Sequence, residues 1–324
     1  MSASYPGTLL SLGSINADFE VRVNQPVGSR ETLLAHDFSR LAGGKASNTA
    51  WLGACFGHTS RLLGRVGDDD LAEQALGRLR DAGVDLSAVT AAANTPTGMS
   101  MIMVPPDGKK HIVLSTNAND CWDEAAIHKM LQAIAQTRPP ACLIVDYEVP
   151  AAVAHQAIDT AQQHGIAVVV DPSFPDRVEP DMFAKLLAIT PNADEAQTLT
   201  GIRVSSVHQA ARAARQLHES GVQIACVRLS DGGCVLAAGD GTIHVPPGQA
   251  EPTDSTGAGD AFTGVFAIAL LEGKAPQEAA VWGVAAANIA VTGYGSKPAY
   301  PNREDIIRQA HSLTNQPRNL DASG

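Results

Sequence analysis

The sequence predicts an α/β fold in which helices cover both faces of a mainly parallel β-sheet, and a second, smaller sheet stands apart from it. Short apolar runs alternate with alanine-rich helical stretches along most of the 324 residues. Apolar residues make up 44% of the chain and aromatic residues only 4%, which favours helices packed closely on a sheet over an aromatic-lined barrel. The length suits one large domain that carries an elaboration.

The alternation of strands and helices can be followed from the N-terminus. Predicted strands cover 8–13, 59–67, 141–146, 167–171 and 223–229, and predicted helices cover 47–57, 69–83, 151–165, 206–220 and 261–271. These strands are apolar at successive positions, so both of their faces should be buried. Such strands, alternating with helices, are typical of a parallel sheet that is covered on both sides.

Two segments interrupt this alternation. Residues 17–27 place Phe19, Val21 and Val23 on one face of a strand and polar residues on the other, and residues 98–115 predict a hairpin that turns near 106–108. We expect them to form a small sheet, and an antiparallel edge on the main sheet is the alternative. The predicted division is a body of 1–16, 41–97 and 118–313, a lid of 17–40 and 98–117, and a disordered tail of 314–324.

Composition and charge argue against several classes of partner. The net charge is −11, and an acidic surface repels nucleic acid and anionic membranes, so we expect neither as a partner. No apolar run approaches the roughly 20 residues that span a bilayer. The N-terminal stretch lacks the basic region of a signal peptide, which predicts a cytoplasmic protein. The five cysteines show no paired spacing, as expected for reduced thiols rather than disulfides or a metal site.

A glycine-rich motif, "DSTGAGDAF", begins at Asp254 and directly precedes a predicted apolar helix. Backbone N–H groups can converge at such a helix start and bind an anion. Asp260 would repel a phosphate there, but it has a role if it takes a proton from an attacking hydroxyl. A glycine turn capped by an aspartate is the competing interpretation. The sequence contains no Walker A loop, and its first strand–helix turn lacks the GxGxxG pattern of dinucleotide enzymes.

Two further motifs contain residues that suit polyol recognition. "GSINAD" follows the first predicted strand, at the strand end where α/β proteins bind ligands, and its Asn16 and Asp18 can bond to several hydroxyls. "LAGGKASNTA" places Lys45 and Asn48 at a helix start beside two glycines. Taken alone, the first motif favours an Asx-rich turn, and Lys45 fits a solvated surface lysine.

Together the three motifs resemble the signatures of the ribokinase family of carbohydrate kinases, the PfkB group, in order and in spacing. The resemblance extends from about residue 9 to about residue 312. It implies a ribokinase-like three-layer αβα sandwich with a small β-sheet lid. It also implies an ATP-dependent transfer of the γ-phosphate to a primary hydroxyl of a sugar, with Mg²⁺ accompanying the ATP.

The resemblance implies a role for each matching position. Asp260 would be the catalytic base, and the backbone N–H groups of Gly257, Ala258 and Gly259 would form the anion hole. The sugar contacts would be Asn16, Asp18, Gly44, Lys45, Asn48 and Glu148, together with Asp260. The nucleotide contacts would be Asn192 and Glu195 of an NxxE motif, Ser230, Gly233, the anion-hole glycines and Asn288. Glu195 would equally suit the first turn of a helix.

Further implications concern a monovalent cation, the lid and the nucleotide loop. Asp254, Thr256 and Gly295 match a potassium site, although Ala299 stands where relatives often have serine. The lid would exclude water and supply a homodimer contact. Arg228 and Ser230 depart from the family's "TLGxxG" pattern, which puts the detailed phosphate contacts in question.

The expected acceptor is D-ribose, which would yield ribose 5-phosphate. Fructose, another sugar or a nucleoside would keep the same chemistry with a different acceptor. A sugar-binding regulator without catalysis is an alternative from another functional class. The complete GAGD motif argues against it, and the departures at Arg228 and Ser230 argue for it.

Overall fold

The computed structural model describes residues 7–106, 110–239, 241–249, 253, 255–293, 296–313 and 317–320. Its larger sheet has the strand order β14-β13-β12-β11-β10-β9-β8-β1-β4-β5. These strands are β1 (Thr8–Leu12), β4 (Thr59–Gly67), β5 (Asp85–Ala92), β8 (Ala141–Asp146), β9 (Ala167–Asp171), β10 (Ala188–Ile189), β11 (Ile224–Arg228), β12 (Cys234–Ala238), β13 (Gly241–Val245) and β14 (Arg318–Asn319). The strands from β5 to β11 in this order pair in parallel, and those from β11 to β14 pair antiparallel.

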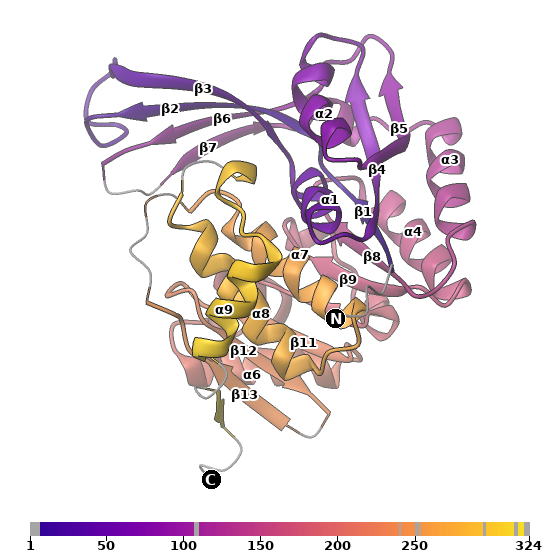
Figure 1. The fold of residues 1–324 in the computed structure, drawn as a ribbon, viewed down its shortest axis with the longest axis vertical. Helices are drawn as coiled ribbons and strands as arrows, with labels where there is room; N and C mark the ends of the chain where they lie inside the picture. The colour runs from indigo at the N-terminus through magenta and orange to yellow at the C-terminus, as the bar shows by residue number, and fades with distance from the viewer. Residues whose placement is uncertain are drawn as a thin grey trace.

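Helices lie on both faces of this sheet, as predicted (Figure 1). The helices are α1 (Lys45–Cys55), α2 (Leu71–Asp81), α3 (Glu124–Ala135), α4 (Ala151–Gln163), α5 (Ala193–Thr200), α6 (Val207–Glu219), α7 (Ala258–Leu271), α8 (Pro276–Ala290) and α9 (Arg303–Leu313). Successive residues of a strand point to opposite faces. Leu10 accordingly packs into a core with α3, α4 and α6, while its neighbour Leu9 packs into a second core with α7, α8 and α9.

The smaller sheet has four strands in the order β3-β2-β6-β7 and projects from the rest of the molecule (Figure 1). Its strands are β2 (Asn16–Val23), β3 (Ala35–Gly43), β6 (Gly98–Val104) and β7 (His111–Ser115). Strands β6 and β7 pair antiparallel, which confirms the hairpin, and residues 107–109 of its turn lie outside the described residues. The alternative, an antiparallel edge on the main sheet, is therefore wrong.

The two faces of the small sheet are buried in the opposite way to what their polarity suggests. Glu20 lies on the predicted polar face of β2, yet only 5% of it is exposed. On the opposite face Phe38 is 59% exposed and stacks on Phe19. The polar face is turned toward the body of the protein, so the apolar face is left outward.

The C-terminal segment also departs in part from its prediction. Arg318 and Asn319, within the predicted disordered tail, form β14 and pair with His244 and Ile243 of β13. Antiparallel backbone hydrogen bonds order these two residues, which corrects the prediction there, while 314–316 and 321–324 lie outside the described residues. The five cysteines were expected to be free and buried. All are free thiols, and Cys142, Cys226 and Cys234 are buried, but Cys55 and Cys121 are exposed, which corrects the expectation for these two.

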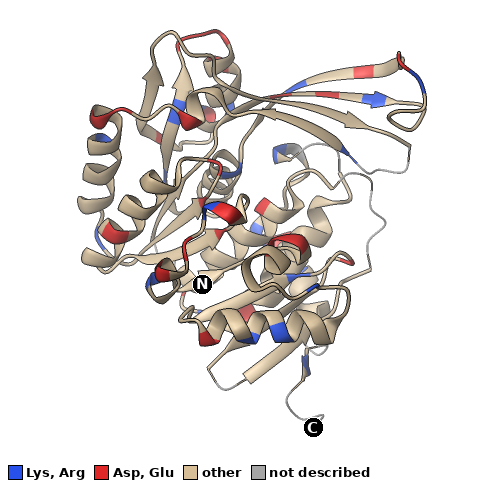
Figure 2. Ribbon diagram, turned by 180° about the vertical axis from the view of Figure 1, so that it is seen from behind, with Lys and Arg blue, Asp and Glu red and all other residues tan. Residues whose placement is uncertain are grey.

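Acidic and basic residues are scattered over the described chain (Figure 2). Among the helices that the structure describes, none has the length and hydropathy that a bilayer-spanning helix needs.

Candidate active site

A pocket of about 860 Å³ opens between the small sheet and the body. Its walls come from the inner face of β2, β6 and β7, from α1, from the ends of main-sheet strands and from the start of α7. The predicted site residues that line it are Asn16, Asp18, Gly44, Lys45, Asn48, Glu148, Asn192, Glu195, Ser230, Gly233, Thr256, Gly257, Ala258, Gly259, Asp260 and Asn288. Asp254 and Gly295 of the predicted cation site lie outside the described residues.

The start of α7 has the features of an anion site. Its N-cap residue, Gly257, has a left-handed backbone (φ 74°), and no side chain caps the helix. A Cβ at Gly257 would lie 2.4 Å from the Oη atom of Tyr300, so only glycine fits this conformation and this space. The first N–H groups of an uncapped helix carry partial positive charge and suit an anion.

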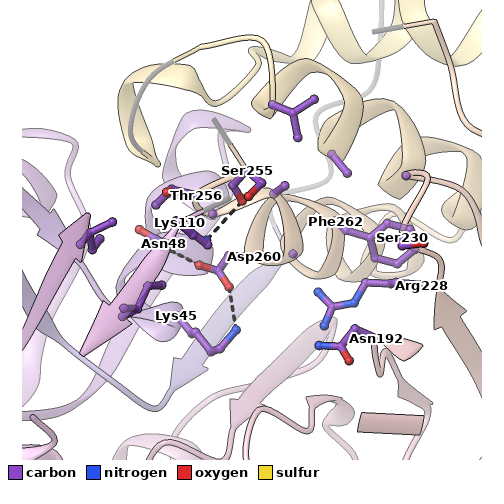
Figure 3. Close-up of a pocket in the computed structure, with 18 of the residues that line it drawn as sticks. Lys45, Asn48, Lys110, Asn192, Arg228, Ser230, Ser255, Thr256, Asp260 and Phe262 are labelled. Carbon is purple, nitrogen blue, oxygen red and sulfur yellow. Dashed lines mark hydrogen bonds and ion pairs between the residues drawn. The ribbon is translucent and has the colours of Figure 1, made fainter. Parts of the chain in front are cut away.

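Asp260 lies in the first turn of α7 and is bonded to two residues of the "GGKASN" motif (Figure 3). The Nζ atom of Lys45 lies 3.2 Å from Oδ1 of Asp260, and Nδ2 of Asn48 lies 2.6 Å from Oδ2. Burial by itself would raise the pKa of Asp260, but Lys45 and Asn48 outweigh it and hold the pKa below its ordinary value. The carboxylate therefore stays ionised and can accept a proton.

Lys45 is not a solvated surface lysine. Its ammonium group lies between Asp260 and Asp171, whose Oδ1 is 3.7 Å away, and 24% of its side chain is exposed. Burial would lower the pKa of Lys45, yet the surrounding carboxylates hold it well above its usual value. The preceding Gly44 has a φ of 91°, and a Cβ there would lie 2.4 Å from the carbonyl oxygen of Ser14. The glycine thus lets α1 start close to the end of β1.

The "GSINAD" residues form one end of the pocket. Asn16 begins β2, and its Oδ1 accepts a hydrogen bond of 2.8 Å from Asn119. Asp18 is 7% exposed and lies against Gly43, where a Cβ would be 2.0 Å from Oδ2. Burial raises the pKa of Asp18 to about 6, opposed by a hydrogen bond from Ser100 and by the charge of Lys297. The Asx-turn interpretation is therefore wrong, because both side chains belong to a strand.

Lys297 is a buried lysine behind this end of the pocket. Its Nζ donates to the carbonyl of Ala42 at 2.9 Å, to Oγ of Ser47 at 3.1 Å and to Oδ1 of Asn48 at 2.7 Å. The last bond fixes the amide of Asn48 so that its nitrogen faces Asp260. Burial lowers the pKa of Lys297 to about 7, although Asp18 and Asp260 oppose the shift.

Glu148 completes the acidic side of the pocket beyond the end of β8. Burial raises the pKa of Glu148, and nearby Lys45 limits the rise. Its backbone N–H donates to Asp146 at 2.9 Å, and Asp146 also accepts from the backbone of Ser14 at 3.1 Å. These bonds tie the ends of β1 and β8 together and hold Glu148 at the pocket.

The NxxE residues lie on the opposite side and cap a helix. Asn192 accepts from the N–H groups of Asp194 and Glu195, each at 2.9 Å, and Oε2 of Glu195 accepts from the N–H of Asn192 at 2.8 Å. This is a complete capping box at the start of α5. Glu195 also accepts from Arg228 at 3.2 Å, so its carboxylate has both a local and a long-range role.

The far end of the pocket is glycine-rich and apolar. It is lined by Gly232, Gly233, Gly248, Ala287, Asn288 and Val291. Asn288 is 5% exposed, and its Nδ2 donates to the carbonyl of Val284 at 2.8 Å within its own helix. A flat apolar group with few polar contacts, such as a nucleobase, fits this end.

Several residues in or next to the pocket were not predicted. Asp171 ends β9 and lies next to the pocket residues Lys45 and Arg228, so the rule that ligands bind at strand ends would have found it. Lys110, just before β7, donates to the carbonyl of Ser255 at 3.3 Å and joins the small sheet to the loop before α7 (Figure 3). Ser100 and Lys297 carried no distinctive local pattern. Only packing between distant segments brings Ser100 and Lys110 to the pocket wall and Lys297 to its place behind the wall.

The donor set suits a metal ion that arrives with phosphates. No cluster of three or more His, Cys, Asp or Glu residues within the described ranges could hold a metal alone. Mg²⁺ is commonly bound by one or two carboxylates together with substrate phosphates and water. Asp171 and Glu195, beside the start of α7, provide such carboxylates. The residues present therefore fit Mg²⁺ bound with a nucleotide.

Comparisons with known proteins identify the family and the fold of the chain. The chain is 31% identical to the ribokinase of Haemophilus influenzae over 301 residues, covering 93% of this chain and 97% of that protein. It is 29% identical to the deoxyribokinase of Salmonella typhi, covering 91% and 96%. The structure of Arabidopsis thaliana ribokinase complexed with ribose and ATP is similar with a TM-score of 0.80 and 28% identity, covering 94% and 98%. Residues 7–303 match the pfkB family carbohydrate kinases, and the chain belongs to that family.

Proposed function

We propose that this carbohydrate kinase transfers the γ-phosphate of ATP to the primary hydroxyl of D-ribose. The observation that carries the proposal is the placement of Asp260. It is a buried, ionised carboxylate at the positive end of α7, bonded to Lys45 and Asn48 beside a pocket end made of polyol-binding side chains. A proton acceptor next to an anion site is what attack by a hydroxyl on a phosphoryl group requires.

The acceptor hydroxyl would lie beside Asp260, with the other sugar hydroxyls facing Asn16, Asp18 and Glu148. Amide and carboxylate groups both accept hydrogen bonds from hydroxyls, and amides also donate. As the sugar oxygen bonds to phosphorus, its proton becomes acidic and passes to Asp260. The N–H groups of Gly257, Ala258 and Gly259 would stabilise the phosphoryl oxygens.

The nucleotide would occupy the other half of the pocket. The base would lie in the apolar end near Asn288 and Gly233, and the phosphates would pass Ser230 on the way to α7. Magnesium bound with ATP would neutralise phosphate charge, with Asp171, Glu195 and Asn192 facing it. The carbonyl of Thr256, with Asp254 and Gly295, would form a potassium site that supports the loop before α7.

The small sheet would close over the sugar and also contact a second subunit. We assign 17–40 and 98–117 to this lid, because their inner face lines the pocket through Asp18, Ser100 and Ile102. The lid's closure would keep water from the transferring phosphate. A complete proton acceptor and anion site support catalysis over a non-catalytic sugar-binding role.

An acceptor panel tests the proposal. D-Ribose, 2-deoxy-D-ribose, D-fructose and adenosine are each incubated with Mg-ATP, and the products are identified by ³¹P NMR. We expect D-ribose to give the highest kcat/KM and ribose 5-phosphate as product, and we expect sodium in place of potassium to lower the rate. A higher kcat/KM for another acceptor would contradict ribose specificity. Sugar binding without turnover on any acceptor would contradict the kinase proposal.

The Asp260→Asn variant is the internal control of this panel. It is nearly isosteric and replaces the carboxylate that would accept the proton with a neutral amide, so kcat should fall by about 10³-fold, within the usual range for a catalytic base. Sugar affinity measured by calorimetry should change little. Retained turnover would show that another group takes the proton.

A further inference from the structure

Arg228 is a buried arginine at the end of β11 whose side chain extends into the pocket (Figure 3). Only 11% of the side chain is exposed. Its Nη2 lies 3.2 Å from Oε2 of Glu195 and 3.5 Å from Oδ2 of Asp171. Among the described residues its Nε has no hydrogen-bond partner, although the atom is buried. The two carboxylates therefore hold the guanidinium group through Nη2, while its other N–H donors remain available to a ligand.

The other nitrogen of Arg228 lies against the anion site. A Cβ on Gly259 would be only 2.4 Å from Nη1, so the guanidinium fills the space that a side chain there would need. The first turn of α7 carries partial positive charge, and a cation beside it is unfavourable in the absence of an anion. The position makes physical sense when a phosphate lies against both Arg228 and the backbone N–H groups of the loop, so that its negative charge offsets both.

The two carboxylates explain how the site tolerates the charge of Arg228. Asp171 and Glu195 neutralise Arg228. Asp171 also accepts from Thr263 of α7 at 3.3 Å and is shared with Lys45 at 3.7 Å. Lys45 and Arg228 thus approach the start of α7 from two sides of the pocket. Such a pair suits the three oxygens of a transferring phosphoryl group, over which negative charge is spread.

We propose that Arg228 is a catalytic residue that donates hydrogen bonds to the γ-phosphoryl group of the bound nucleotide. This inference rests on the proposed function and deepens it. The bond between the γ-phosphorus and the bridging oxygen breaks, and the bond from the sugar oxygen forms. The sugar proton goes to Asp260, and ADP leaves with the bridging electron pair. Arg228 transfers nothing and stabilises charge on the γ-phosphoryl oxygens, which the planar fork of arginine matches.

Two variants test this role against a purely structural one. Arg228→Gln removes the charge, and Arg228→Lys keeps the charge but loses the fork. Arg65→Gln is the matched control, because Arg65 is also buried, with 4% of its side chain exposed, and pairs with Asp123 at 3.1 Å away from the pocket. Binding of ADP and of the non-hydrolysable analogue AMP-PNP is measured by calorimetry, along with kcat and thermal stability.

We expect Arg228→Gln to lower kcat by about 10²-fold or more, the loss typical of removing one stabilising donor. Its affinity for AMP-PNP should fall at least about 10-fold further than its affinity for ADP, because only AMP-PNP has a γ-phosphate. Arg228→Lys should recover only part of both losses. Arg65→Gln should lower stability and leave the preference between the two nucleotides unchanged.

Equal losses of ADP and AMP-PNP affinity, or complete recovery by lysine, would overturn the inference and leave Arg228 as a counter-ion of Asp171 and Glu195. If Arg228→Gln does not fold, Arg228→Lys decides, since it retains the charge between the carboxylates. If the wild-type chain phosphorylates no acceptor, the proposed function fails, but the nucleotide comparison still judges Arg228 by itself.

Discussion

Asp18 is a residue whose burial conflicts with its charge. The side chain lies within the pocket wall, and its Oδ1 has no hydrogen-bond partner among the described residues. Burial raises the pKa of Asp18 to about 6. When the pKa of a carboxyl group is higher in the folded state than in the unfolded state, the fold has its full stability below the unfolded pKa. It loses stability as pH rises through the folded pKa. At neutral pH the ionised side chain therefore costs stability, which a sugar hydroxyl would offset by donating to it.

Replacing Asp18 with Asn should accordingly separate stability from affinity. We expect the melting temperature at about pH 8 to rise by roughly 1–3 °C, and the gain to shrink toward about pH 5, where Asp18 is itself protonated. The KM for the sugar should rise by about 10- to 100-fold, because a hydrogen bond to a charged group is lost. Calorimetric melting and steady-state kinetics measure the two effects.

Asp37→Asn is the control for this experiment. Asp37 belongs to β3 of the same sheet, pairs with Arg22 and does not line the pocket. The hydrogen bond from Arg22 lowers the pKa of Asp37, which is the opposite sign from Asp18. We therefore expect no gain in stability at any pH and an unchanged KM. A lower melting temperature for Asp18→Asn at about pH 8 would contradict the argument.

Among the elements, the small sheet has the clearest division of roles. Its residues facing the body, such as Asp18, Ser100 and Ile102, line the pocket, while those one position along the strand face outward. Phe38, Met101 and Val113 on the outer face are 59%, 51% and 61% exposed. Strands β3 and β7 are also sheet edges, which can pair with another chain. An apolar outer face with such edges suits contact with a second copy of this chain.

Charge placed on this outer face should therefore prevent self-association. We expect the wild-type chain to elute as a dimer in size-exclusion chromatography with light scattering, and Val113→Glu to elute as a monomer. A buried unpaired charge is costly at an interface, so the dissociation constant of the dimer should rise at least about 100-fold.

Ile307→Glu provides the matched control, since Ile307 is an apolar residue of α9 that is 37% exposed, far along the chain from the small sheet. It should leave the mass unchanged. A monomeric wild-type chain, or a dimer that survives Val113→Glu, would contradict assembly through the lid.

At the scale of the whole molecule, Glu272 joins segments that are far apart in the sequence. It lies just after α7, and accepts from Arg303 at the start of α9 at 3.1 Å and from His58 before β4 at 3.0 Å. Arg303 also donates to the carbonyl of Phe56 at 2.8 Å. Burial alone would raise the pKa of Glu272, but His58 and Arg303 together lower it to about 2.

This cluster should contribute to stability in a pH-dependent way. A carboxylate with a lowered pKa stabilises the fold above its unfolded pKa, and the contribution is lost as pH falls through about 4.5 toward 2. We expect Glu272→Gln to lose about 2–3 kcal/mol of unfolding free energy near neutral pH. The difference from wild type should shrink steadily below about pH 4.5 in urea titrations.

Glu278→Gln is the control for this prediction. Glu278 of α8 pairs at 2.6 Å with Lys274, which lies just before that helix, but 51% of the Glu278 side chain is exposed. Such surface pairs contribute little, so its loss should cost under about 0.5 kcal/mol at any pH. A cost for Glu272→Gln that does not vary with pH would show that packing rather than charge accounts for the effect.

Much of the fold could be predicted because its signals are local. Apolar residues at successive positions predicted the buried parallel strands, and the structure confirms β1, β4, β8, β9 and β11 close to their expected bounds. Sequence alternation also predicted a separate small sheet. It did not predict which face of that sheet points inward, because alternation defines two faces without saying what each will contact.

The candidate site also combines features that local sequence predicts with features that depend on tertiary packing. The sequence by itself determined the glycine-rich start of α7, the polar residues after β1 and the helix start at Lys45, since each depends on neighbours along the chain. Only the tertiary structure decided that Asp260 meets Lys45, 215 residues away. It also brought Arg228 and Lys110 into the pocket wall and set Lys297 against Asn48. Local backbone preferences define elements, whereas the crossovers of the parallel sheet and the packing of its two layers decide which distant side chains meet.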